Sequence, residues 1–282
     1  MKINNIGIIG NPLSHSLSPL MHSSAISHLK INYKFKKWEL NIEDLEKFFL
    51  SLNTNNIKGG CVTIPHKESI LPFLTEMDDD VKIINACNWF KVIPTGIKGF
   101  NTDHIGFIKS LPKNLLVNIK NLNCVVFGAG GSSKSIVFGL IKNGCKNITI
   151  VNRSIENAQK IANKYPELNI NSFNLGDSAS CDFIKNADLI VNTTSLGMSS
   201  GPDPGNSILK ESVLKKNVVG IDLVYSPLET PFLKLIKSFG GEIINGIPIL
   251  INQAISGLEI ITGERCPYSI MHNAIRTKLK TV

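Results

Sequence analysis

The sequence predicts an α/β protein with two domains, each built on an open, mostly parallel β-sheet. Two observations predict this class. Strand-like and helix-like segments alternate along most of the chain, and a polar passage rich in Asn and Lys separates two such series. The 282 residues are enough for two modest domains, and 43% hydrophobic with 18% charged residues is the composition of a globular protein.

The first series begins with a short apolar run that ends in a Gly-Asn-Pro turn. Ser18 and Pro19 then occupy an expected N-cap position and first helical position. Alternating and helically spaced apolar residues continue the series, and Pro65 is expected to open its last helix. The predicted strands cover residues 5–9, 33–40 and 60–64, and the predicted helices cover residues 19–29, 42–52 and 65–74.

The second series follows a predicted helix that ends near residue 111 and a polar passage that ends at residue 123. The composition places the domain junction in this passage. The predicted strands cover residues 124–127, 147–151, 189–192 and 218–223, and the predicted helices cover residues 132–143 and 155–165. The chain then returns to helix, and residues 249–262 are expected to pack across a cleft or back onto the first domain.

Charge and cysteine patterns narrow the classes of partner. The net charge of +8 is spread along the chain, whereas nucleic-acid binding would gather it beside aromatic residues. An anionic substrate and a polyphosphate cofactor would also gain from a positive field. Six scattered Cys without a CxxC pair indicate free thiols and no metal site. No apolar run approaches the roughly 18–20 residues of a membrane helix, so we expect a cytoplasmic protein.

A glycine-rich turn between a buried strand and a helix indicates a dinucleotide site. Its first glycine permits a tight turn, its second lets the backbone approach a pyrophosphate, and the small Ser133 lets the helix pack closely. The N–H groups that open the helix would face the phosphates. The residues expected to bind the cofactor here are Gly128, Ala129, Gly130, Gly131 and Ser132.

The end of the following strand distinguishes NADP from NAD. An NAD site carries an acidic residue about 20 residues after the glycines, but this chain has Asn152, Arg153 and Ser154 there. An Arg with two small hydrogen-bonding neighbours suits the 2′-phosphate of NADP, which we therefore expect as the cofactor. The alternative is that Ser154 caps the next helix and Arg153 is simply solvated.

Polar residues at the ends of elements in the first domain suggest a substrate site. Ser16 and Ser18 would suit a carboxylate or a polyol, although Ser18 could serve only as a helix cap. Lys67 would stand in the first turn of the helix opened by Pro65, where the positive end of the dipole disfavours its charge and favours a proton shuttle. Asp103 is either an N-cap or, if Lys67 lies within hydrogen-bond reach, its catalytic partner.

Seven motifs occur in the order and approximate spacing of the shikimate dehydrogenase family, and the resemblance covers essentially the whole chain. They are G-N-P with S-L-S, V-T-x-P-x-K, N-T-D, G-A-G-G, N-R-S, N-T-T-S-L-G-M and Q-A, which begin at residues 10, 62, 101, 128, 152, 192 and 253. The resemblance implies two domains with a cleft between them. It also implies NADPH-dependent, reversible reduction of 3-dehydroshikimate to shikimate, a step toward chorismate and the aromatic amino acids.

The resemblance implies a role for each matching residue. Lys67 and Asp103 would form the catalytic pair. The substrate would be bound by Ser16, Ser18, Thr63, Asn88, Tyr225 and Gln253. Further cofactor contacts would come from Thr194, Ser195, Met198 and Gly246. Residues 1–103 with 247–282 would form the substrate-binding and catalytic domain, and residues 104–246 a Rossmann-type NADP-binding domain, in a monomer or a homodimer.

Several residues depart from the family pattern. Cys61 replaces an Asn, Asn157 replaces a basic residue, and Trp89 and His104 stand where Thr and Gly are usual. Trp89 and His104 flank two substrate clusters, so they bear on substrate identity and affinity. The alternatives are a quinate dehydrogenase of broader specificity, a catalytically silent NADP-binding relative and, on charge alone, a nucleic-acid-binding protein.

Overall fold

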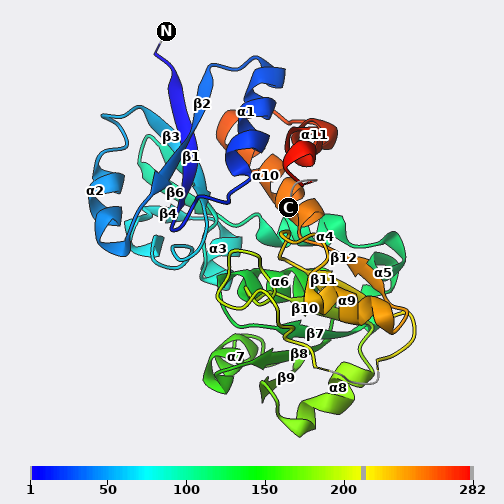
Figure 1. The fold of residues 1–282 in the computed structure, drawn as a ribbon. Coiled ribbons are helices and arrows are strands. Elements are labelled where there is room, and N and C mark those ends of the chain that lie inside the picture. The colour runs from blue at the N-terminus through cyan, green and yellow to red at the C-terminus, as the bar shows by residue number, and fades with distance from the viewer. Residues whose placement is uncertain (1, 211–213, 280–282) are drawn as a thin grey trace. The chain divides into compact units, whose positions relative to one another are not determined.

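The computed structural model describes residues 2–210 and 214–279, which form two compact α/β units (Figure 1). One unit contains the chain up to Gly106 together with the C-terminal part from Leu250 on, and the other runs from Phe107 to Ile249. The boundaries drawn from the sequence, after residues 103 and 246, lie three residues before each of these.

The polar passage before β7 belongs to the second unit, so the junction placed there from composition is wrong. It forms α5 (Lys113–Asn118) and the 3-10 turn η3 (Ile119–Asn121). Leu115, Ile119 and Leu122 are buried in the core of that unit, whereas the Asn and Lys residues around them are exposed. A few well-spaced apolar residues are enough to anchor a passage that is polar on average.

The first unit is built on a mixed six-stranded sheet with the order β2-β1-β3-β5-β6-β4. β1 pairs in parallel with β2 and β3, and β4 with β6, whereas β5 is antiparallel to both its neighbours. Only Pro94 and Thr95 connect β5 to β6, and so short a link allows only a hairpin. The predicted class is confirmed, with an additional hairpin. The strands are β1 (Asn4–Gly10), β2 (Tyr33–Glu39), β3 (Ile57–Val62), β4 (Glu76–Met77), β5 (Trp89–Ile93) and β6 (Gly96–Phe100).

Helices cover both faces of this sheet (Figure 1). On one face α1 packs beside α11. α10 belongs to this unit from Leu250 on, which agrees with the expectation that this helix packs back onto the first domain. On the other face Phe48 and Phe49 of α2 meet Phe90 edge-on. The helical elements are α1 (Ser18–Leu29), η1 (Ile42–Asp44), α2 (Leu45–Leu50), η2 (Leu71–Phe73), α3 (Asp79–Ile84), α4 (Asp103–Ser110), α10 (Ile247–Thr262) and α11 (Tyr268–Leu279).

Two predicted helix starts differ from the structure. Residues 65–74 form turns and η2 rather than an α-helix. The reason is Pro72, which lacks the N–H that would bond to the carbonyl four residues earlier, so a regular α-helix cannot continue through it. α1 begins at Ser18 with Leu17 at its N-cap and no side-chain cap, so Ser18 is not the capping residue.

The second unit is built on an all-parallel six-stranded sheet with the order β12-β11-β10-β7-β8-β9. Counted from the first strand of this unit, the order is 6-5-4-1-2-3, which is the order of dinucleotide-binding Rossmann folds. Such folds bind ligands beyond the carboxyl ends of the strands where the order reverses, here between β7 and β10. The strands are β7 (Asn123–Phe127), β8 (Asn147–Asn152), β9 (Asn169–Asn174), β10 (Leu189–Asn192), β11 (Val219–Asp222) and β12 (Glu242–Ile244).

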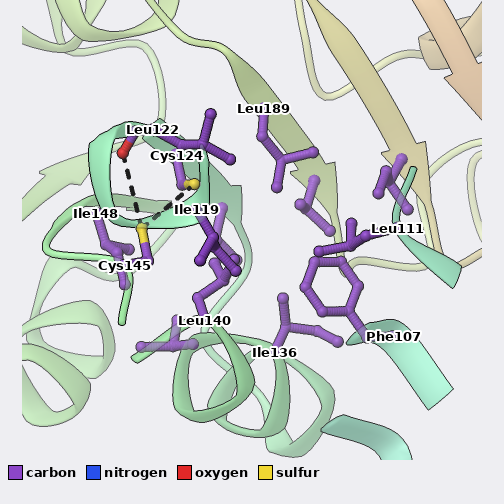
Figure 2. Packing of buried hydrophobic residues seen from close by; sticks show 14 of the residues in the cluster. Phe107, Leu111, Ile119, Leu122, Cys124, Ile136, Leu140, Cys145, Ile148 and Leu189 are labelled. Carbon is purple, nitrogen blue, oxygen red and sulfur yellow. Dashed lines mark hydrogen bonds between the residues drawn. The ribbon is translucent and has the colours of Figure 1, made fainter. Parts of the chain in front are cut away.

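A continuous apolar core lies on one face of this second sheet (Figure 2). Phe107, Ile136 and Leu140 from the helices pack there with Ile148 and Leu189 from the strands. The helices of this unit that follow α5 are α6 (Gly131–Lys142), α7 (Ile155–Ala162), α8 (Cys181–Lys185), which the short η4 (Ser178–Ser180) precedes, and α9 (Pro231–Ser238). Among the described residues, none of the helices combines the length and the hydropathy needed to cross a bilayer.

Candidate active site

Lys67 and Asp103 form a largely buried ion pair in the first unit. Lys67 lies in the turns after β3, and Asp103 is the first residue of α4. Nζ of Lys67 donates to Oδ2 of Asp103 at 2.5 Å, and the two side chains are 15% and 13% exposed. The groups therefore lie within the hydrogen-bond reach that proton transfer requires.

The placement of Lys67 has a different cause from the one predicted. No α-helix begins at Pro65, so the argument from a helix dipole does not hold for Lys67. Instead the backbone carbonyl of Lys67 accepts a hydrogen bond from the N–H of Cys87 at 2.7 Å. This bond ties the turns after β3 to the segment that leads into β5, and it fixes the backbone from which the ammonium group extends.

Asn88 links the ion pair to α10. Its Nδ2 donates to Oδ1 of Asp103 at 2.8 Å and to Oε1 of Gln253 at 3.3 Å. Its Oδ1 accepts the backbone N–H of Thr102 at 2.7 Å, which fixes the direction of the amide because only its oxygen can accept. The network thus joins the segment before β5, the start of α4 and the middle of α10, which are far apart in the sequence.

Ser18, the first residue of α1, and Ser16, in the loop before it, approach this group. Burial raises the pKa of Cys61 to about 12, while a hydrogen bond with Ser18 and the charge of Lys67 oppose that rise. Ser18 and Lys67 therefore lie around the same thiol. Oγ of Ser16 accepts the backbone N–H of Ser18 at 3.3 Å, and the half-buried Thr63 follows β3 two residues after Cys61.

The sequence assigned no role of their own to Trp89 and His104. In the structure Trp89 takes part in this network, and His104 lies beside it. The indole Nε1 of Trp89 donates to Oε1 of Gln253 at 3.2 Å. His104 directly follows Asp103 in the chain, and its Nε2 lies 2.9 Å from Oδ2 of Asp80. The signal for both was their departure from motifs that otherwise match the family.

In the second unit, the glycine turn after β7 leaves room for a phosphate. Gly128 has φ +109°, in the region that favours glycine, and its carbonyl accepts the hydroxyl of the buried Ser133 at 2.7 Å. Gly130 is the N-cap of α6, and a Cβ there would meet no atom within 4 Å. The open space in front of Gly130 and the N–H groups of the first turn of α6 fit the pyrophosphate of a dinucleotide.

The loop after β10 lies against this turn. The backbone N–H and the hydroxyl of Thr193 both donate to the carbonyl of Phe127, at 2.9 and 2.6 Å. A Cβ on Gly128 would lie 2.4 Å from Oγ1 of Thr193, so glycine is also required there for packing. The carboxyl ends of β7 and β10 are thereby joined at the point where the strand order reverses.

Asn152 is the last residue of β8, and Arg153 and Ser154 follow it, at the strand end where a 2′-phosphate is expected. Arg153 is exposed, and Nδ2 of Asn152 donates to the carbonyl of Ser154 at 2.9 Å. Ser154 is the N-cap of α7 by position but makes no side-chain cap bond; its hydroxyl donates to Oε2 of Glu156 at 2.6 Å. This bond lowers the pKa of Glu156. The reading of Ser154 as a capping side chain is therefore wrong.

The other residues of the second unit that were expected to bind cofactor or substrate have different surroundings. Thr194 donates its hydroxyl to Oδ1 of Asn192 at 2.7 Å, and the N–H of Met198 bonds to the carbonyl of Ser195 at 3.2 Å. Gly246 is buried, and a Cβ there would lie 2.1 Å from the carbonyl oxygen of Leu223. Packing therefore requires a glycine at this position. Tyr225 lies half-buried three residues after β11.

Asp222, which sequence reasoning missed, organises the loops after β10 and β11. It is fully buried, and it accepts hydrogen bonds from Nδ2 of Asn192 at 3.0 Å and from the hydroxyl of Thr230 at 2.6 Å. The N–H of Val224 donates to it as well, at 3.0 Å. Burial raises the pKa of Asp222 to about 6, although these bonds oppose the rise. A lone carboxylate within an apolar strand gave no sign of these distant partners.

The two halves of the chain match two family models. Residues 8–90 match the model described as shikimate dehydrogenase substrate binding domain, and residues 110–202 match the one described as shikimate / quinate 5-dehydrogenase. The chain is also 39% identical over 274 residues to the shikimate dehydrogenase (NADP(+)) of Methanococcus aeolicus, and the match covers 97% of both chains.

Solved structures agree with the sequence matches. The crystal structure of shikimate dehydrogenase from Aquifex aeolicus superposes with a TM-score of 0.87 at 35% identity, over 97% of this chain and 98% of that one. A shikimate dehydrogenase in complex with NADP+ superposes with a TM-score of 0.85 at 33% identity, over 98% of this chain and 96% of that one. With both domains matched in order over almost the full length, this chain belongs to the shikimate dehydrogenase family.

Proposed function

We propose that the chain is an NADP-dependent shikimate dehydrogenase, which reduces 3-dehydroshikimate to shikimate reversibly on the route to chorismate and the aromatic amino acids. The observation that carries the proposal is the pair formed by Lys67 and Asp103, at 2.5 Å and mostly shielded from water. Hydrogen bonds connect this pair to Asn88 and Gln253 within the unit that holds the substrate-domain match.

The chain's own part in the reaction is to hold a proton at the reacting oxygen. In the direction of reduction, the pair of Lys67 and Asp103 delivers to the substrate carbonyl oxygen the proton that makes it a hydroxyl. NADPH, when bound, would supply the hydride. Because the two side chains share one short hydrogen bond, they take part in proton transfer as a unit.

The remaining substrate contacts position the ring. Ser16 and Ser18 would bind the carboxylate through their hydroxyls, while Thr63, Asn88 and Gln253 would hold the ring hydroxyls. Tyr225 would contribute from the second domain. Several hydrogen bonds of fixed direction discriminate well between polyols, because a missing partner leaves a buried polar group unpaired.

NADP would be held by the elements that follow β7, β8 and β10. The glycine turn and Ser132 would bind the pyrophosphate at the start of α6, and Asn152, Arg153 and Ser154 would bind the 2′-phosphate. Thr194, Ser195 and Met198 would lie along the nicotinamide. The carboxylate of Glu156 already bonds to Ser154, so it must turn away for a phosphate to bind there.

We infer in addition that the protein acts in the cytoplasm, as a monomer or a homodimer, on a small substrate and without nucleic acid. Its spread positive charge suits an anionic ring acid and a polyphosphate cofactor. A second candidate function is oxidation of quinate, because the family model matched by residues 110–202 is described for both ring acids.

The deciding experiment follows nicotinamide absorbance with shikimate or quinate, each with NADP or NAD. The proposal expects rapid reduction of NADP with shikimate. Turnover with quinate or NAD alone would move the protein to the second candidate. Folded protein that binds NADPH but turns over neither acid would contradict both and point to a silent relative.

A further inference from the structure

Trp89 occupies the space between the substrate network and α10. It is fully buried at the start of β5, opposite Cys61 on β3, and its ring meets His22 of α1 edge-on at 5.4 Å. Gly257, one turn after Gln253 on α10, faces it: a Cβ on Gly257 would lie 1.9 Å from Cε2 of Trp89. The indole and the missing side chain of Gly257 therefore fit each other.

The side-chain amide of Gln253 is held with its oxygen toward Trp89. Oε1 lies 3.2 Å from Nε1 of Trp89, 3.3 Å from Nδ2 of Asn88 and 3.4 Å from Oγ1 of Thr102. Nε2 of Gln253 donates to the carbonyl of Leu250 in its own helix at 2.9 Å. This leaves one N–H of the amide for a further partner.

The N–H of Trp89 and the carbonyl of Leu250 together prevent the amide from turning over. An indole N–H can only donate, so a reversed amide would place two donors against each other. The hydroxyl of Thr102 could rotate to accept from a reversed amide, and Nδ2 of Asn88 has Oδ1 of Asp103 at 2.8 Å as its nearer acceptor. Nδ2 of Asn88 also donates to Oγ1 of Thr102 at 3.1 Å, and this hydroxyl donates to the backbone carbonyl of Gln253 at 3.0 Å. Asn88 and Thr102 therefore depend less on the side-chain oxygen of Gln253 than the indole does.

We propose that Trp89 is a positioning residue for substrate binding: its N–H fixes the amide of Gln253 so that Gln253 offers an N–H, and not an oxygen, to the ring acid. This inference deepens the proposed function and rests on it, since Gln253 is expected to bind the substrate. It explains why Trp89 and Gly257 occur together, as the glycine makes room for the ring that reaches Gln253.

The test compares Trp89→Phe with wild type in shikimate binding by calorimetry and in steady-state turnover. Phe fills most of the space but cannot donate. We expect the Kd and KM for shikimate to rise about threefold to tenfold, as for one lost hydrogen bond, with kcat and the KM for NADP changed less than twofold. Trp38→Phe is the matched control, because Trp38 is the other tryptophan and lies on β2, on the face opposite Phe35 and α1.

Two variants at Gln253 separate positioning from packing. If Trp89 acts through the amide, Trp89→Phe causes no further rise in Kd in a Gln253→Met background. Gln253→Glu keeps an oxygen for the indole but has no N–H to offer, so it should weaken shikimate binding as much as Gln253→Met does. Because Gln253→Glu leaves Trp89 in place, it tests the direction of the amide even if Trp89→Phe folds poorly.

The outcomes are distinguishable from failure of the proposed function. Wild-type protein that neither binds nor oxidises shikimate would overturn the function and the inference with it. Wild-type protein that binds shikimate, with Trp89→Phe binding equally well or with the same loss in the Gln253→Met background, would overturn the inference alone. Full affinity in Gln253→Glu would show that the substrate meets an oxygen and would do the same.

Discussion

The candidate site of the first unit is formed by side chains, and that of the second unit is formed mainly by backbone. In the first unit, side chains from distant segments meet: Lys67 from the turns after β3, Asp103 from α4 and Gln253 from α10. In the second unit, the candidate phosphate site is almost entirely backbone, formed by one local turn in which Gly128 and Gly130 provide conformation and space. The tertiary fold therefore determines the first site, whereas a short stretch of sequence largely determines the second.

This difference predicts how each site fails. A network of directed side-chain bonds loses chemistry when one group is removed, because the others cannot take its place. A backbone cradle has no functional side chain to remove, and it fails when an added side chain fills its space or strains its turn. The following substitutions test that contrast.

The largest effect is expected from Lys67→Ala. Removal of the ammonium group takes away the proposed proton donor and leaves Asp103 largely buried without its ion-pair partner. Turnover with shikimate and NADP should fall by about 10²–10⁴-fold, with a much smaller change in the KM for shikimate. A small and equal loss in both parameters would show that Lys67 only binds substrate.

A matched control is available in the same unit. Lys82 also pairs with an aspartate, Asp79, at 2.8 Å, but the two side chains are 61% and 89% exposed. An exposed pair of this kind contributes little to stability, and its hydrogen bond lies outside the network. Lys82→Ala should therefore leave both turnover and the KM unchanged.

The backbone cradle is tested by two alanine substitutions that differ in one respect. At Gly128, alanine meets both a φ of +109° and Oγ1 of Thr193 at 2.4 Å, so we expect a loss of about 1–3 kcal/mol of unfolding free energy. At Gly130 a Cβ meets nothing, so stability should stay within about 0.5 kcal/mol. Yet Gly130→Ala should weaken NADP binding at least about tenfold, since its methyl group enters the space for the pyrophosphate.

Chemical denaturation and a fluorescence titration with NADPH check this pair of variants. Equal NADPH affinity in Gly130→Ala and wild type would mean that the pyrophosphate does not lie against this glycine. The same loss of stability in both variants would remove the distinction between the strained and the open position.

The contrast between the sites also explains what could be predicted from the sequence. The alternation of elements, the glycine turn and the Asn152–Ser154 segment are local patterns, and the parallel sheet followed from them. The bond between Asn88 and Gln253 joins residues 165 positions apart, and no local pattern contains that information. The pairing of Lys67 with Asp103 was conditional for the same reason.

The errors have equally local causes. The helix predicted after Pro65 was interrupted by Pro72, whose missing N–H outweighs the apolar spacing around it. The hairpin of β5 and β6 was overlooked because Pro94 and Thr95 lack the glycine that usually marks so tight a link. The domain junction was drawn from average polarity, which does not register single buried residues such as Leu115 and Ile119.

The smallest expected effect concerns Asp222, around which the second unit, like the first, has a buried side-chain network. Burial raises its folded pKa from 3.8 to about 6, so the folded protein binds its proton more tightly than the unfolded chain does. The contribution of this group to stability is therefore fully present below pH 3.8 and is lost as the pH rises through about 6. Asp222→Asn cannot titrate, so the unfolding free energy of wild type relative to the variant should rise by about 2 kcal/mol between pH 7 and pH 4.5. Denaturant unfolding of both proteins at the two pH values measures this difference, and a relative stability that moves the opposite way would mean that the bonds to Asn192, Thr230 and Val224 hold the carboxylate charged despite its burial.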